Sequence, residues 1–118
     1  MPLKIGNVTQ AKVGQLASTD TTQKTLFTLP AQAQIVNVFG FSANDASGVV
    51  TLYARPISQL TPVAFATIAL AAAAGGVLGT FTSATIPYSR QSEPVVISAA
   101  ITTGPTGTPS PIVRVDFM

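Results

Sequence analysis

The sequence predicts an all-β fold, either a single antiparallel β-sandwich or a jelly-roll-like barrel, with about seven to eight short strands. Short apolar runs rich in Val, Ile, Phe and Thr recur along the 118 residues, and side chains of these types favour strands. Clusters of Gly, Pro, Asn, Asp and Ser separate these runs roughly every 8 to 14 residues. A chain of this length can bury one core, so residues 1–118 are expected to form one domain.

Residues 1–22 differ in composition from the rest of the chain. Half of the Lys and Arg residues lie before residue 25, and only residues 12–17 have a strand pattern, which is weak. We consider two interpretations: the segment is the first strand of the sandwich, or it is an extended N-terminal arm that reaches a neighbouring subunit. No apolar core follows Lys4, so no secretory signal is expected.

The remaining strands are predicted in order along the chain. They cover residues 23–29, 35–42, 49–54, 62–70, 77–86, 94–101 and 112–117. The proline- and glycine-rich run 102–111 is predicted to be a loop, because Pro lacks the N–H group that a central strand needs.

Alternation of apolar and charged residues is cleanest in the last predicted strand. Successive side chains of a strand point to opposite faces. The pattern therefore predicts that Val113, Val115 and Phe117 point inward. Arg114 and Asp116 are predicted to share the outward face, where their opposite charges neutralise each other.

Residues 68–81 form the least polar stretch of the chain, and three interpretations of this stretch are possible. A membrane span is disfavoured because Ala and Gly contribute little to membrane insertion. A helix is disfavoured because Gly75-Gly76 ends the alanine run after too few residues for stability. The flanking Val, Ile, Phe and Thr residues favour two strands joined by a hairpin or short loop at residues 73–76. A single helical turn over residues 71–74 stays open as an alternative.

The low content of charged residues predicts that other protein covers part of the surface of this chain. Charged side chains make up 8% of the chain, against about 25% in ordinary soluble domains, and several predicted strands are apolar on both faces. Contiguous exposed apolar surface usually marks an interface. We therefore expect other protein to cover much of this chain, with a stable, neutral monomer as the alternative. The six basic residues are scattered and give a net charge of +2, so no nucleic-acid groove is predicted.

The residue types that common enzyme chemistry needs are scarce. The sequence contains no His and no Cys, which removes the usual general base near neutral pH, thiolate metal sites and disulfides. The four acids, Asp20, Asp45, Glu93 and Asp116, lie far apart in sequence. Residues 42–48 supply one carboxylate where a calcium loop supplies several. The sequence therefore predicts no catalytic residue, no metal site and no cofactor.

One constellation recurs, in which an aromatic residue and an arginine lie two positions apart on one face of an extended segment. Tyr53 with Arg55 and Tyr88 with Arg90 have this spacing. Tyrosine and arginine are enriched at protein–protein contacts. These four residues are the candidate interface, and the alternative is a sandwich rim with ordinary stacking.

Residues 21–43, TTQKTLFTLPAQAQIVNVFGFSA, are followed by VTLYARP (50–56), an alanine–glycine strand pair and a closing strand after TGPTGTPSP. Over residues 20–117 this order resembles small virion proteins of tailed bacteriophages. The resemblance implies a β-sandwich or jelly-roll subunit, made in the host cytoplasm, that decorates, cements or extends the head or sits near the tail. It implies a non-enzymatic protein whose partners are the major capsid protein and copies of itself, often as a trimer, without a role at nucleic acid or membrane.

Composition and resemblance lead to the same functional prediction, a structural protein of a virus particle of the capsid decoration or cement type. Two alternatives belong to other classes. A receptor- or glycan-binding β-sandwich would use an aromatic pocket near Tyr53 or Tyr88. A small membrane protein would use the apolar stretch at residues 68–81.

Overall fold

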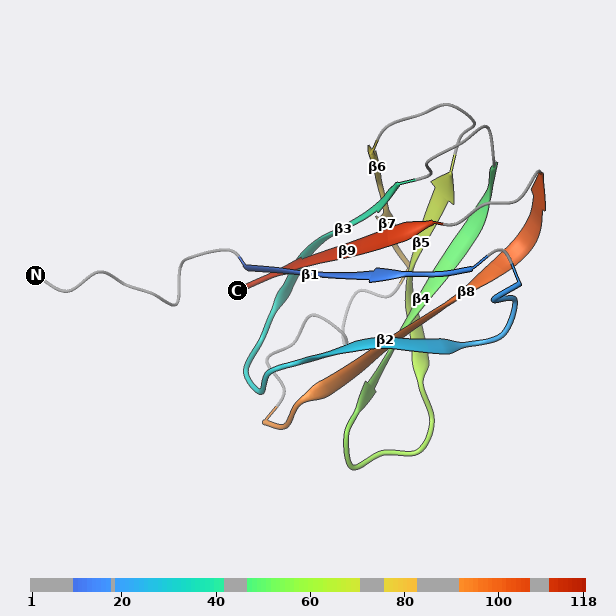
Figure 1. Ribbon diagram of the computed structural model, residues 1–118. Helices are drawn as coiled ribbons and strands as arrows, with labels where there is room; N and C mark the ends of the chain where they lie inside the picture. Colours follow the sequence, from blue (N-terminus) through green and yellow to red (C-terminus); the bar gives the residue numbers. More distant parts are fainter. Residues whose placement is uncertain (1–9, 18, 42–46, 71–75, 83–91, 107–110) are drawn as a thin grey trace, which may run out of the picture.

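The computed structural model describes residues 10–17, 19–41, 47–70, 76–82, 92–106 and 111–118, and within these ranges it contains strands and no helix. Two antiparallel sheets pack face to face (Figure 1). One has the order β1 (Gln10–Gln15), β9 (Ile112–Phe117), β3 (Ile35–Phe41), β6 (Gly76–Leu78). The other has the order β2 (Lys24–Leu29), β8 (Val95–Thr106), β4 (Ser47–Pro56), β5 (Val63–Leu70), β7 (Thr80–Phe81). The predicted all-β sandwich is confirmed.

The strand pairing is that of a jelly roll. β1 pairs with β9, β2 with β8, β3 with β6 and β4 with β5, so the chain pairs from its two ends inward. Alternate pairs of this ribbon belong to opposite sheets: β1–β9 and β3–β6 to one, β2–β8 and β4–β5 to the other. Wrapping a ribbon in this way produces the double-sheet jelly roll. The β-sandwich therefore has the strand order of a jelly roll.

The inward faces of both sheets form the core. Among its largest fully buried side chains are Phe65, Leu16, Leu29, Leu52, Ile68 and Ile97. The alternation predicted for the last strand is confirmed, because Val113, Val115 and Phe117 are all buried. Arg114 and Asp116 form the expected ion pair, with Nε of the arginine 3.1 Å from Oδ1 of the aspartate.

A β-bulge in β3 changes which of its residues face the core. The register with β9 shifts between Ile35 and Asn37, so Val36 is an extra residue on β3. A bulge breaks the two-residue repeat of inward positions. Ile35 and Val38 are consequently both buried although they are three residues apart. The apolar residues on both faces of this strand thus result in part from the bulge, and only in part from a covered outer surface.

The run predicted as one strand at residues 77–86 bends at Gly79. β6 precedes this glycine and pairs with β3, whereas β7 follows it and pairs with β5 in the other sheet. A Cβ atom at Gly79 would lie 2.5 Å from Cγ2 of Val38 and 2.9 Å from Cγ1 of Ile68. The chain can therefore cross between the sheets here because glycine has no side chain.

The predicted hairpin at residues 73–76 is wrong in its pairing, since β5 and β6 lie in different sheets. Residues 71–75, with the alternative helical turn, lie outside the described residues. No helix in the described part of the chain is long and apolar enough to cross a membrane.

The loop predicted at residues 102–111 is wrong for its first half, because β8 continues to Thr106. β2 pairs with β8 only from Val95 to Ala99. Beyond Ala99, β8 pairs with β4 alone. Pro105 falls between the paired residues Thr103 and Thr106, where the register with β4 is irregular. Proline is tolerated at such bulged edge positions because no ladder hydrogen bond needs its missing N–H group.

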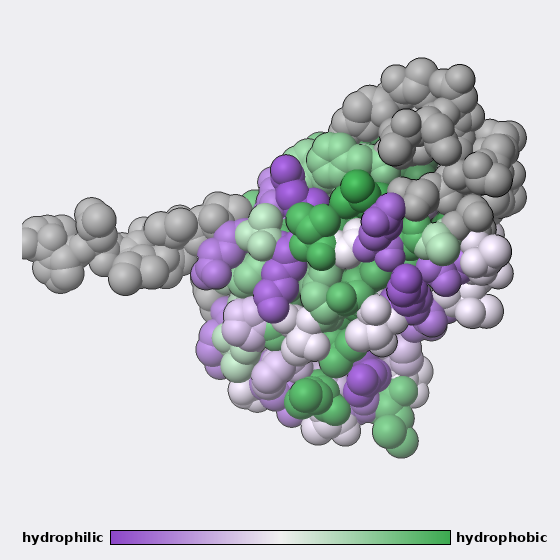
Figure 2. Space-filling model, viewed as in Figure 1, coloured by the Kyte–Doolittle hydropathy of each residue, from purple (hydrophilic) through white to green (hydrophobic). Residues whose placement is uncertain are grey.

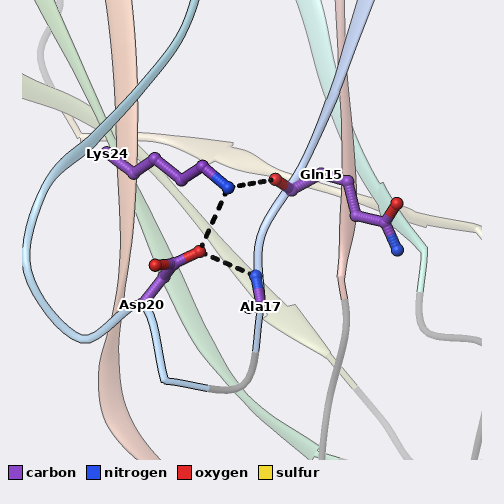
Figure 3. Close-up of polar contacts among 4 residues, drawn as sticks. All are labelled: Gln15, Ala17, Asp20 and Lys24. Atoms are coloured by element: carbon purple, nitrogen blue, oxygen red, sulfur yellow. Dashed lines mark hydrogen bonds and ion pairs between the residues drawn. The ribbon is translucent and has the colours of Figure 1, made fainter.

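Residues 10–15 form an edge strand of the chain's own sheet, and residues 1–9 lie outside the described part. Figure 3 shows how the turn after β1 is held. Oδ2 of Asp20 accepts a 2.7 Å hydrogen bond from the N–H of Ala17 and lies 3.4 Å from Nζ of Lys24. Nζ of Lys24 also donates to the carbonyl oxygen of Gln15 at 3.4 Å. These contacts tie the end of β1 to the start of β2 in the opposite sheet.

Candidate interaction surface

The outer face of the four-stranded sheet is rich in apolar side chains. The strand register places Val13, Arg114, Phe39 and Leu78 in one row across β1, β9, β3 and β6. We name as the Arg114 face the surface formed by Val13, Gln15, Phe39, Phe41, Leu78, Ile112, Arg114 and Asp116. Val13 and Leu78 are each 59% exposed. Figure 2 shows hydrophobic residues among polar ones over the part of the surface where β1 and β9 run.

Arg114 occupies the middle of this face. Its guanidinium carbon lies 4.3 Å from the ring centroid of Phe39 and 5.9 Å from that of Phe41. Nη2 donates a 3.3 Å hydrogen bond to Oδ2 of Asp116, beside the ion pair at Nε. A guanidinium over an aromatic ring is attracted by the ring quadrupole. The positive charge is thus neutralised within the face, so a partner need not supply a counter-charge.

Two features of the sequence build the Arg114 face. The strict alternation of β9 turns Arg114 and Asp116 outward, as predicted. The bulge at Val36 then turns Phe39 and Phe41 to the same side, because Phe39 pairs with Arg114 and Phe41 with Ile112. The alternation of the last strand indicates from sequence alone that Arg114 points outward. Its aromatic partners lie about 75 residues earlier in the chain, and only sheet pairing brings them beside the arginine.

Two of the four predicted interface residues lie on the other sheet. Leu52 and Ala54 on β4 are buried, so the alternating Tyr53 and Arg55 point outward, where both are half-buried. Nη1 of Arg55 donates to the carbonyl oxygens of Gln59 at 2.7 Å and Ile57 at 3.3 Å. Arg55 therefore holds the loop that follows its own strand. Tyr88 and Arg90 lie outside the described residues, so the interface role of these four residues stays a prediction.

The connection between β4 and β5, residues 57–62, is named here the Leu60 loop. Oε1 of Glu93 accepts hydrogen bonds from the Ser58 hydroxyl at 2.6 Å and the Ser58 N–H at 3.1 Å. These bonds stabilise the carboxylate and hold the pKa of Glu93 below its ordinary value, against a smaller opposing effect of desolvation. The N–H of Ile57 also donates to the carbonyl oxygen of Pro94 at 3.0 Å. The backbone of the loop is thus fixed to the segment before β8.

The fixed Leu60 loop presents apolar side chains to solvent. Leu60 at its tip is 94% exposed, Ile57 is 54% exposed, and Val63 at the start of β5 is 41% exposed. Figure 2 shows hydrophobic side chains at the lowest point of the view, where Figure 1 places this loop. None of the six residues of the loop carries a charge. The loop is therefore an uncharged apolar projection at one end of the sandwich.

Nowhere among the described residues do three or more His, Cys, Asp or Glu side chains gather where they could hold a metal ion. A solvent-open hollow of about 210 Å³ lies between the start of β1, the end of β9 and the turn from β2 to β3. Pro30, Ala31, Ala33, Phe117 and Met118 give it an apolar lining, completed by two glutamines.

Comparison with known proteins identifies the fold. No family model matches the sequence, and no curated protein matches it by sequence. Among solved structures, a chain from the capsid of Ralstonia phage GP4 is similar, with a TM-score of 0.65 and 13% sequence identity. The alignment covers 99% of this chain and 88% of that chain. At this identity the likeness establishes a shared fold, a two-sheet sandwich that also occurs in the capsid of a bacteriophage.

Proposed function

We propose that the chain is a non-enzymatic structural protein of a bacteriophage particle, most specifically a capsid decoration, cement or minor head protein. In this role it forms one domain over residues 1–118 and stabilises the shell through protein–protein contacts. Its partners are the major capsid protein and further copies of itself, as a trimer or another homo-oligomer. It is made in the host cytoplasm and ends in the virion.

The observation that carries this proposal is the Arg114 face. A free monomer normally keeps large apolar side chains off its sheet surfaces or scatters them singly. Here Val13, Phe39, Leu78 and Ile112 lie together around a charge that is already neutralised. Depletion of net charge with retained arginine and aromatic residues is typical of the centre of an interface. The fold shared with a phage capsid chain supports the same setting.

The test uses the phage particles that contain the chain. Shells lacking the chain are incubated with the wild-type protein or with Val13→Asp or Leu78→Asp, and pelleted. Each aspartate is exposed in the free chain and tolerated there, but it would be desolvated without a partner at an interface. We expect wild type to sediment with the shells and both variants to remain in solution. Thr67→Asp, on the outer face of the other sheet, is the matched control and should sediment.

Two results would overturn the proposal. One is that mass spectrometry finds no copies of the chain in purified particles. The other is that glycans bind the chain and Tyr53→Ala abolishes that binding, which would favour the receptor- or glycan-binding alternative.

A further inference from the structure

Four strands lie at the outer edges of the two sheets, and they differ in length. β6 and β7 are three and two residues long, whereas β1 and β2 have six residues each. The free edge of a strand offers N–H and C=O groups to which a strand of another molecule can add, and very short edge strands reduce this hazard. β1 and β2 are therefore the edges at which the chain needs another form of protection.

The hydrogen bonds of β1 identify the groups on its free edge. The N–H of Leu16, directly after β1, donates to the carbonyl oxygen of Pro111 at 2.9 Å, so the backbone of Leu16 faces the β9 side. Along an antiparallel strand, residues whose N–H and C=O point to the partner alternate with residues whose groups point away. The backbone groups of Ala11, Val13 and Gln15 consequently lie on the free edge of β1.

Two lysines bond backbone oxygens across the side of the sandwich where β1 and β2 lie. Nζ of Lys24 on β2 donates to the carbonyl oxygen of Gln15 on β1 at 3.4 Å, as Figure 3 shows. Nζ of Lys12 on β1 donates to the carbonyl oxygen of Thr28 on β2 at 2.9 Å. Each of the two long edge strands thus supplies a lysine to a backbone acceptor of the other.

Lys12 lies on the inner face of its sheet, which is an uncommon place for a charge. It pairs with Val115, which is fully buried, and residues that pair directly point to the same face. The next inward residue of β1 is Gly14, where a Cβ atom would lie 2.9 Å from Cβ of Leu26 on β2. The two strands therefore approach closely, and a strand added along either edge would desolvate an ammonium group, which is costly.

The use of lysine in the chain supports a specific purpose for this arrangement. Charged residues make up 8% of the sequence, and three of them are lysines. Both lysines within the described residues make the contacts given above. Charged side chains, lysine above all, and inward-pointing charges are devices by which natural sheets prevent strand addition at their edges. The described lysines are thus concentrated where the two long edges need them.

We propose that Lys12 and Lys24 protect the edges β1 and β2 against strand addition by a second copy of the chain. The free subunit is thereby kept from polymerising edge to edge. This inference goes beyond the proposed function and does not depend on it. Contacts through the Arg114 face use side chains on the outer face of the sheet, so the protected edges leave them possible.

Lys12→Met and Lys24→Met, singly and combined in the full-length chain, test the protection. Methionine keeps an apolar stem and removes the ammonium group. We expect the double variant to form large, open-ended assemblies at a concentration at least about tenfold lower than wild type does, measured by sedimentation velocity and light scattering. Amide hydrogen exchange then locates the contact. The N–H groups of Ala11, Val13 and Gln15 should exchange more slowly in these assemblies than in dispersed wild type, because an added strand would bond them.

Three controls separate edge pairing from loss of charge or of stability. Lys12→Arg combined with Lys24→Arg keeps both charges and should stay dispersed. Lys4→Met removes the same charge as either single variant from a position ahead of β1, and it should also stay dispersed. Ala11→Pro, added to the double methionine variant, should restore dispersed protein, because it removes an N–H from the free edge and none from the pairing with β9.

The inference is wrong if the double methionine variant stays as dispersed as wild type, or if Lys4→Met assembles to the same extent. It is also wrong if assembly slows amide exchange in neither β1 nor β2, or if Ala11→Pro fails to restore dispersed protein. The shell-binding test of the proposed function reads side chains of the Arg114 face in wild-type edges. Failure of either test therefore leaves the other conclusion standing.

Discussion

The guanidinium of Arg114 lies over the ring of Phe39, with its central carbon 4.3 Å from the ring centroid. The arginine side chain is 36% exposed, so water still solvates part of the cation in the free chain. Cation–π contacts are worth about 0.5–1 kcal/mol at exposed sites and about 2 kcal/mol when desolvated. A partner that covers the Arg114 face would therefore strengthen a contact that is already in place.

Arg114→Lys tests this contact. Lysine keeps the charge but lacks the planar group that stacks on Phe39 and pairs with Asp116 through two nitrogens. We expect the free energy of unfolding to fall by about 0.5–1 kcal/mol, measured in urea, and shell binding to weaken about tenfold. Thr67→Ala on the outer face of the other sheet is the control. If Arg114→Lys binds shells normally and Thr67→Ala binds them weakly, the shell contacts the five-stranded sheet, and the Arg114 face is not the binding surface.

The fold was predictable where local pattern and sheet geometry agree. In β9, alternation alone assigned Val113 and Val115 to the core and Arg114 to the outer face. In β3 it did not, because a bulge depends on how many residues the paired strand supplies, and that is a property of two segments about 75 residues apart. Pairing between distant segments also explains Pro105. This proline is tolerated in β8 because the pairing with β2 stops at Ala99, so no strand on that side needs its missing N–H group.

The interface role of Tyr53, Arg55, Tyr88 and Arg90 stays a prediction. The arginine that the structure places over an aromatic ring is Arg114, whose partner Phe39 lies on a strand joined to it by sheet pairing. Arg55 lies two residues after Tyr53. Its acceptors are backbone carbonyl oxygens, and every residue offers such an acceptor, so the side-chain sequence carries no signal for them.

Gly79→Ala should destabilise the fold at the point where the chain crosses between sheets. The added Cβ atom would approach Cγ2 of Val38 and Cγ1 of Ile68, and both residues are fully buried. Overpacking of this kind costs about 1–3 kcal/mol, which chemical denaturation measures. Combining Gly79→Ala with Val38→Ala should cost less than the sum of the single changes, because the second removes the clashing methyl groups. Additive costs would show that Val38 is not the obstacle.

Asp20→Ala should loosen β1. It removes the acceptor for the Ala17 N–H and the partner of Lys24 shown in Figure 3. We expect a loss of about 1–2 kcal/mol in the free energy of unfolding and faster amide hydrogen exchange in Gln10–Gln15. Asp20→Asn keeps an acceptor and loses only an exposed ion pair, so it should cost less than about 1 kcal/mol. Equal losses for the two variants would assign the effect to charge alone.

The hydrogen bonds from Ser58 to Glu93 predict a pH dependence of the Leu60 loop. These bonds lower the pKa of Glu93 from its ordinary value of 4.5. A group whose pKa is lowered by folding stabilises the folded form fully above its unfolded pKa, and this contribution is lost as the pH falls through the folded pKa. The bonds from Ser58 to Glu93 should therefore be present at neutral pH and lost as the pH falls below 4.5, while the bonds from Arg55 and from the Ile57 N–H persist. The Ser58 amide proton resonance, followed by NMR, should shift with a midpoint below that value.

In Glu93→Gln the shift should vanish, because the amide does not titrate in this range. A midpoint at or above 4.5 in the wild-type chain would mean that Ser58 does not stabilise the carboxylate, and that the loop is not fixed through this contact.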